Sequence, residues 1–469
     1  MKVCYFWRHI VIACPDLWTH VDIVLNHPLN SSLLARAKVC AARAGKLPLE
    51  IHISDMASEN EFQHWQEIFD SRRANSLGLA NSQGLAPDSL TSDLVHSGLC
   101  KFEFLNDYPD DTVPIRSLEL DLIVFGDVKD YQLAAITYFF ARCRPGVFTQ
   151  YATRIRNEDY ESDYIRFIEA IDDPRSPLEG IRLPLSSQFL ENRWLHTRVL
   201  RINGLCPPWS STAYHGLVEL HIGEGVPELH QRQLVSILRS SPRLRTLRLE
   251  VNTVGESGLT APILLEDIEV LSLTAGSWFS MGPTDDGLHM MSYPGKILRL
   301  ITTRSKPLQL TYFGFPGSVL VDFMARSNVK RLFIRAWGAY DMIPILSQCS
   351  ALQTLILSDC GLYESCAPNL GVPNCKEVWR EAGGPTPITQ INTLYLAGFH
   401  RHCYEQLRGI VERYSVRKLV ICGTYLWHDE ESPNTNQREI ESNLSSITLC
   451  PTVQYFESEK IEVDPEDWD

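Results

Sequence analysis

The sequence lacks a long hydrophobic run, because none of its 469 residues lie in a stretch that approaches the ~18 apolar residues of a membrane-spanning helix. Its apolar run Ile10–Ala13 is also too short for a secretory signal. Positive charge is in deficit, since 43 Lys and Arg against 57 Asp and Glu leave a formal net charge of −14. Binding to phosphates needs clustered Lys and Arg. We therefore expect neither a membrane nor a nucleic acid as a partner.

The common motifs of catalysis and metal binding are missing as well. The sequence has no Gly-rich phosphate loop, no Gly-x-Ser-x-Gly elbow and no His-Glu-x-x-His helix. The segments Cys360 to Cys375 and His400 to Cys403 lack the paired close spacing of a structural zinc site. We predict no catalytic residue, no cofactor and no metal ligand. The 13 cysteines show no regular pairing, which predicts reduced thiols and a cytoplasmic or nuclear location.

The sequence is rich in one recurring pattern, apolar-x-x-Leu-x-apolar. Its clearest copies span residues 244–249, 352–357, 391–396 and 416–421. Each copy is the length of one strand that turns alternate side chains to one face. A single strand of this kind buries little apolar surface, whereas a stacked row buries a continuous core. The recurrence therefore predicts an array of repeats.

The spacing of these copies favours one repeat class. From Leu200 onward, most steps between central leucines are 20 to 27 residues, with two longer steps of 37 and 39. Leucine-rich repeats have periods of about 20 to 29 residues. Amphipathic segments such as 231–240 and 318–327 predict helices between the strands. We predict an α/β fold, a leucine-rich-repeat-like solenoid of parallel strands alternating with helices. The central leucines are Leu118, Leu200, Leu220, Leu247, Leu271, Leu308, Leu332, Leu355, Leu394 and Leu419.

Residues that flank the central leucines are expected on the opposite face of each strand, the concave face of the array. Aromatic residues and arginines at such positions are the types that most often dominate protein interfaces. We therefore predict a partner-binding face without catalysis of its own. Its candidate residues are Arg201, Glu219, His221, Arg248, Arg331, Phe333, Arg335, Tyr395 and Lys418.

The N-terminal segment carries a second motif. It reads Val3-Cys4, then Trp7-Arg8, then Pro15-Asp-Leu17-Trp18, on a helix predicted over residues 3–12 and the turn after it. This segment resembles the C-terminal half of an F-box. A helix predicted at 31–44 and a strand at 47–53 follow it. That order is similar to a large fungal group of F-box proteins with degenerate leucine-rich repeats.

The resemblance implies a function. An F-box docks on the Skp adaptor of a cullin-RING, SCF-type ubiquitin ligase, while the repeats capture the target protein. Carried over to this chain, the residues that would bind the adaptor are Cys4, Trp7, Arg8, Pro15, Leu17 and Trp18.

The first half of an F-box, a Leu-Pro pair and an apolar helix, is not in the sequence. One interpretation is that the gene model starts late. In the other, adaptor binding is lost and the protein is a leucine-rich-repeat interaction scaffold. In that interpretation Trp7, Pro15, Leu17 and Trp18 pack the N-terminal cap of the array.

These features predict four regions. A partial F-box-like segment spans 1–24, and a helix and strand connector with an irregular cap spans 25–110. The degenerate repeat array spans 111–456, with residues 157–173 expected as an inserted helix, and an acidic tail spans 457–469.

Overall fold

The computed structural model describes two compact units, residues 1–227 and residues 228–469. The described residues are 5–27, 30–55, 102–108, 113–124, 128–157, 166–172, 181–223, 225–251, 253–254, 261–274, 293–313, 318–335, 345–346, 348–358, 390–397, 411–422, 442, 445–446 and 450–456.

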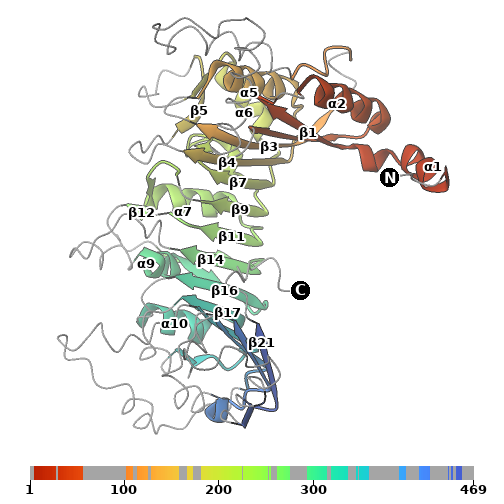
Figure 1. The fold of residues 1–469 in the computed structure, drawn as a ribbon. Coiled ribbons are helices and arrows are strands. Elements are labelled where there is room, and N and C mark those ends of the chain that lie inside the picture. The colour runs from red at the N-terminus through yellow and green to blue at the C-terminus, as the bar shows by residue number, and fades with distance from the viewer. Residues whose placement is uncertain are drawn as a thin grey trace, which may run out of the picture. The chain divides into compact units, whose positions relative to one another are not determined.

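The first unit is built on a sheet of parallel strands in the order β1-β2-β3-β4-β7-β9 (Figure 1). This spatial order is also the chain order, so each strand joins the sheet beside its predecessor. Short strands β6, β5 and β8 form a separate small sheet. The strands are β1 (His20–Leu25), β2 (Leu49–Asp55), β3 (Ile115–Val124), β4 (Gln150–Asn157), β5 (Arg166–Ala170), β6 (Ile181–Leu183), β7 (Val199–Asn203), β8 (Leu205–Cys206) and β9 (Glu219–Ile222).

Two helical segments, α1 (Tyr5–Ala13) and the 3₁₀ turn η1 (Pro15–Trp18), precede the first strand. Others lie between strands, as parallel neighbours require a crossover. They are α2 (Asn30–Ala44), α5 (Asp130–Arg142), α6 (Ser187–Trp194) and the 3₁₀ turn η2 (Thr212–Tyr214). Among the described residues of the whole chain, no helix is both long enough and apolar enough to cross a bilayer.

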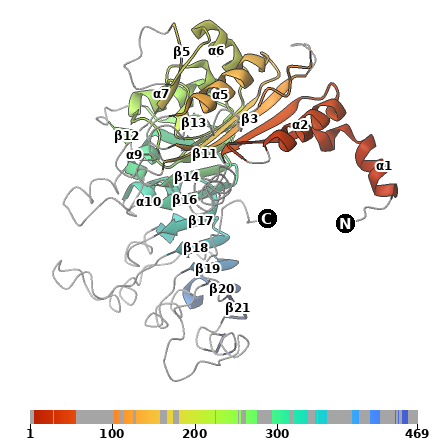
Figure 2. The same cartoon turned by 45° about the horizontal axis from the view of Figure 1, so that its top comes forward.

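The second unit repeats the same plan, with parallel strands in the order β11-β14-β16-β17-β18-β19-β20-β21 (Figure 2). Two further strand pairs, β10 with β12 and β13 with β15, lie outside this run. The elements are β10 (Leu229–His230), α7 (Gln231–Ser240), β11 (Thr246–Leu249), β12 (Thr253–Val254), β13 (Ile263–Leu265), β14 (Val270–Thr274), α9 (Tyr293–Leu300), β15 (Ile301–Thr303), β16 (Leu308–Phe313), α10 (Ser318–Arg326), β17 (Val329–Arg335), β18 (Thr354–Ser358), β19 (Thr393–Ala397), β20 (Lys418–Cys422) and β21 (Thr452–Phe456).

The core of each unit is a row of apolar residues that face one another across neighbouring strands. Their solvent exposure is 1% or less, so each row is a continuous dry stripe. In the first unit the row is Val21, Ile51, Leu118, Tyr151, Leu200 and Leu220. In the second it is Leu247, Leu271, Leu310, Leu332, Leu355, Leu394 and Leu419. The predicted α/β fold of parallel strands alternating with helices is confirmed.

A cluster of aromatic rings packs between β4 and two helices, α5 and α6, in the core of the first unit. The ring of Trp194 on α6 makes edge contacts with Phe140 on α5 at 5.1 Å and with Tyr151 on β4 at 5.0 Å between centroids. Aromatic pairs at this separation stabilise a core beyond the area they bury. The cluster fixes two crossover helices against one strand.

Three details of the predicted array were wrong. β1 pairs with β2 and β2 pairs with β3, both in parallel, so the sheet begins before residue 111. The core position of β16 is Leu310, which pairs with Leu271 and Leu332, and not Leu308. The sequence does not distinguish the two leucines, because they are two residues apart and point to the same face of the strand. Within 157–173, residues 166–170 form β5 and not a helix, since their apolar residues pair with β6 and β8.

Candidate functional site

The N-terminal helical segment exposes an unusual amount of apolar surface. Trp7 and Leu17 are each 59% exposed, and Ile10 and Ile12 are also exposed. Among the described residues nine large hydrophobic side chains are exposed, and four of them lie in this segment of fourteen residues, Tyr5 to Trp18. Figures 1 and 2 both show α1 projecting away from the sheet of its own unit. We call residues 5–18 the docking segment.

Local chemistry explains how the docking segment bends. Pro15 opens the 3₁₀ turn η1, where its missing N–H costs no hydrogen bond. The indole N–H of Trp18 donates to the carbonyl oxygen of Val11 at 2.7 Å. The Arg43 guanidinium of α2 lies 4.2 Å above the Trp18 ring, a cation–π contact. Trp18 thus attaches α1 and η1 to α2.

The structure therefore divides the six residues that the F-box resemblance nominates. Trp7, Pro15 and Leu17 are exposed, whereas Trp18 is half-buried and faces α2. Cys4 and the side chain of Arg8 lie outside the described residues. Three of the nominated side chains are therefore exposed to solvent, and one, Trp18, packs within the fold.

The nominated residues of the strand face differ in exposure. Arg201 is exposed and forms an ion pair with Glu219 on the neighbouring strand, with Nε 2.5 Å from Oε1. Glu219, His221, Arg248, Arg331, Tyr395 and Lys418 are half-buried. The side chain of Arg335 lies outside the described residues.

Phe333 is a correction, because the strand period predicted it on an open face and it is only 8% exposed. Its ring makes an edge contact with Phe313 of the adjacent strand, at 5.1 Å between centroids. On the same row across the sheet, Ile356 and Val420 are also buried. Apolar neighbours in register shield one another, so Phe333, Ile356 and Val420 contribute to packing. Arg248 and Tyr395 lie on the same row and remain half-buried.

In the first unit, the corresponding face of the sheet carries charged side chains that form ion pairs between neighbouring strands. The Arg156 guanidinium binds both carboxylate oxygens of Asp121, at 3.0 Å and 2.9 Å from Nη2. Arg116 pairs with Glu50 on the neighbouring strand. Bidentate and cross-strand pairs of this kind fix side-chain directions, although exposed pairs contribute at most about 1 kcal/mol each.

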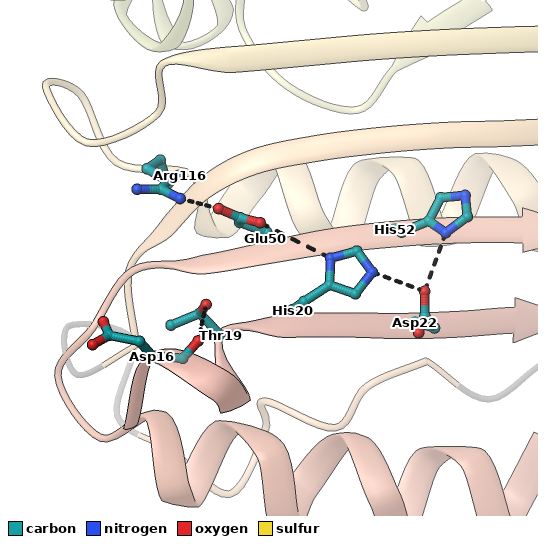
Figure 3. Close-up of polar contacts among 7 residues, drawn as sticks. All are labelled: Asp16, Thr19, His20, Asp22, Glu50, His52 and Arg116. Carbon is teal, nitrogen blue, oxygen red and sulfur yellow. Dashed lines mark hydrogen bonds and ion pairs between the residues drawn. The ribbon is translucent and has the colours of Figure 1, made fainter. Parts of the chain in front are cut away.

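Sequence reasoning missed a cluster on this face, His20, Asp22 and His52, drawn in Figure 3. The Asp22 Oδ1 atom lies 3.1 Å from Nε2 of His20 and 3.2 Å from Nδ1 of His52. The parallel register of β1 and β2 sets Asp22 opposite His52 and His20 opposite Glu50. The signal was present as His-x-Asp at 20–22 and Glu-x-His at 50–52, the period that puts both pairs on one strand face.

A solvent-open hollow of about 470 Å³ lies where β3, β4 and β7 begin. Cationic and imidazole side chains line it, together with small and polar residues. The lining residues are Arg116, Gly146, Thr149, Gln150, His196, Arg198, Val199 and Val218.

The described cysteines form no disulfide, and burial raises the pKa of most of them. Burial raises the pKa of Cys349 to about 12 and that of Cys422 to about 11. Because the thiolate is the reactive form, these two cysteines are inert packing residues. The cysteine and histidine segments at 360–375 and 400–403 lie outside the described residues.

Searches with protein-family models, among curated proteins and among solved structures find no match to this chain.

Proposed function

We propose that this protein is the substrate-recognition subunit of a cullin-RING, SCF-type ubiquitin ligase. In this proposal residues 5–18 act as a partial F-box that binds the Skp adaptor. The strands form a degenerate leucine-rich-repeat solenoid whose polar face captures the target protein. The chain contributes binding and no catalysis.

One observation supports the adaptor half of the proposal above the others, the exposure of Trp7 and Leu17 on a short helical segment. Large apolar side chains at such exposure lose stabilisation in water and gain it on a partner, at roughly 25 cal/mol for each Å² buried. Trp is also among the residues that most often dominate binding energy. These side chains therefore provide suitable anchors for a protein partner.

The target half of the proposal rests on the strand face. Arg248, Arg331, Tyr395 and Lys418 remain partly accessible on the second unit. Residues that share this face recur with each strand, so contacts can add up along an extended target. Arginine and tyrosine supply the directed and aromatic contacts that interfaces favour.

The adaptor half is tested by co-purification of the chain with the Skp adaptor. The double variant W7A/L17A should lose most of the captured adaptor while its thermal unfolding midpoint stays unchanged, because both side chains are exposed. The matched control is L195A, since Leu195 is 51% exposed in the same unit but outside the docking segment. Equal capture by the wild type and by W7A/L17A would remove these two anchors from the proposal.

A second candidate is a leucine-rich-repeat interaction scaffold with no ligase link. The inward position of Trp18, bonded to Val11 and covered by Arg43, favours it, because a cap residue packs in this way. Failure of both this chain and an N-terminally extended chain to bind the adaptor would support the scaffold and reject the ligase subunit.

A further inference from the structure

The cluster of His20, Asp22 and His52 has the composition of a metal site. It joins two imidazole nitrogens and one carboxylate oxygen whose positions all lie within 4.8 Å of one another. The three residues come from adjacent parallel strands, so the hydrogen-bonded register of β1 and β2 holds them together. Figure 3 shows both imidazole rings turned toward the Asp22 carboxylate.

We propose that these three side chains bind a divalent transition-metal ion, with Zn²⁺ as the best match. Zinc takes imidazole nitrogens and carboxylate oxygens at about 2.0 to 2.2 Å in a tetrahedron, which places neighbouring ligand atoms about 3.3 Å apart. The separations from Asp22 Oδ1, 3.1 Å to His20 Nε2 and 3.2 Å to His52 Nδ1, match this edge length. Imidazole nitrogen and carboxylate oxygen are both common ligands of Zn²⁺, so all three side chains are chemically suitable.

A fourth residue supplies an independent argument. The Glu50 carboxylate lies beside the other ring nitrogen of His20, with Oε2 4.0 Å from Nδ1. Its second oxygen pairs with Arg116, which holds the carboxylate in place. Metal-bound histidines commonly donate their remaining N–H to a carboxylate, which fixes the tautomer and strengthens the ligand. Glu50 lies beside the His20 nitrogen that would need this support, at ion-pair distance and just beyond hydrogen-bond distance, so a small side-chain movement would complete the contact.

The position in the fold indicates what the ion would do. β1 is the terminal strand of its sheet in the described structure, hydrogen-bonded to β2. An ion held by β1 and β2 together adds a side-chain bridge to this edge. Because His20 and Asp22 are exposed, a fourth coordination position remains open to water or to a partner's side chain. The inference is independent of the proposed ligase function.

The test is a calorimetric titration of the full chain, freed of metal by dialysis against a chelator, with Zn²⁺ alone. The wild type should bind one equivalent of Zn²⁺ more than the double variant H20A/H52A. The variant E50Q should keep that equivalent with about 10- to 100-fold weaker affinity. H215A is the matched control, because His215 is an exposed histidine of the same unit outside the cluster, and it should bind like the wild type.

Cobalt provides the second readout, since the chain contains 13 cysteines that also attract metals. Co²⁺ at this site should show visible ligand-field bands that disappear in H20A/H52A, without the ultraviolet charge-transfer band of a thiolate ligand. Circular dichroism should show that H20A/H52A remains folded, because His20 is exposed and His52 is partly exposed, outside the apolar core. Equal Zn²⁺ stoichiometry and affinity in the wild type and in folded H20A/H52A would overturn the proposal and leave the cluster as an ion-pair network.

Discussion

Asp55, the last residue of β2, is a buried carboxyl group whose environment makes ionisation costly. Its Oδ2 atom accepts hydrogen bonds from Ile123 N–H, at 3.1 Å, and from the side-chain amide of Gln132 on α5. Gln132 also donates to the Ile123 carbonyl at 2.9 Å. Burial outweighs these hydrogen bonds and raises the pKa of Asp55 from 3.8 to about 6. The group connects β2, β3 and α5.

This raised pKa predicts a pH-dependent stability. The folded chain binds the Asp55 proton more tightly than the unfolded chain, so it holds more protons between pH 3.8 and about 6. The contribution of Asp55 is therefore present at low pH and is lost as the pH rises through that range, at a cost of about 3 kcal/mol. The measurement is urea unfolding of the wild type and D55N from pH 4 to pH 7. The stability difference should shift in favour of D55N as the pH rises.

The control for D55N is D172N, because Asp172 is exposed and its pKa moves in the opposite direction. Hydrogen bonds from the Ser187 hydroxyl and N–H lower the pKa of Asp172. Its contribution is present above the unfolded pKa and is lost as the pH falls. A D55N profile parallel to that of the wild type would show that Asp55 ionises in the folded chain without cost.

Leu355 tests the core row of the second unit. It is fully buried in β18 and lies opposite Leu332 and Leu394 on the neighbouring strands. L355A should lower the free energy of unfolding by about 2 to 5 kcal/mol, through lost burial and the cavity left behind. Thr354, the half-buried residue beside it, is the control, and T354A should cost about 0.5 kcal/mol or less. Equal unfolding midpoints for both variants would place Leu355 outside the core.

At the scale of elements, Gly204 joins β7 to β8 where the chain leaves one sheet for another. Its φ of +99° is a conformation that other residues rarely adopt, and an added Cβ would lie 2.5 Å from Cβ of Ile155 on β4. G204A should therefore destabilise the first unit by at least about 2 kcal/mol, through backbone strain and a steric clash. Thermal unfolding followed by circular dichroism measures this loss.

Gly146 separates the two causes. Its φ of +83° is similar, but an added Cβ would meet nothing within 4 Å. G146A should show only the backbone cost, about 1 to 2 kcal/mol. If G204A is no more destabilising than G146A, Ile155 moves aside and the contact between β4 and the turn is not tight.

The strands that sequence reasoning found and those it missed differ in a physical way. Leucine at the central position marked β11, β17, β18, β19 and β20, because a repeated large side chain stands out against its neighbours. β4 has Tyr151 at that position and was not recognised from the sequence. The burial of Tyr151 depends on its contact with Trp194, which only the folded chain brings to it. The burial of Phe333 likewise depends on a cross-strand neighbour, which no single strand reveals.

The two candidate sites also differ in whether the sequence alone could reveal them. The docking segment was predicted from a local motif, and Trp7 and Leu17 are exposed there. The histidine cluster was not predicted, because it exists only through the register that sets Asp22 opposite His52, 30 residues further along the chain. Local sequence therefore indicates single-segment surfaces, while sites shared between strands require the fold.

At the scale of the whole molecule, the proposed function assigns two binding activities to separate stretches of the chain. The docking segment occupies residues 5–18 of the first unit, and the accessible basic positions Arg331 and Lys418 lie on β17 and β20 of the second. Register places these two residues on one row of the sheet, with Thr354 and Thr393 between them. A reversal of charge on this row should weaken binding of the target protein and leave adaptor binding unchanged.

We therefore expect the two activities to be separable. R331E/K418E should weaken capture of an acidic target at least tenfold and leave adaptor binding unchanged, whereas W7A/L17A should show the reverse. Like-charge contacts introduced at an interface are costly, while exposed or half-exposed substitutions alter stability little. Quantitative mass spectrometry of proteins bound to each variant measures both activities at once. Joint loss of adaptor and target in R331E/K418E, with an unchanged unfolding midpoint, would contradict the division, because it would require both partners to contact the same row.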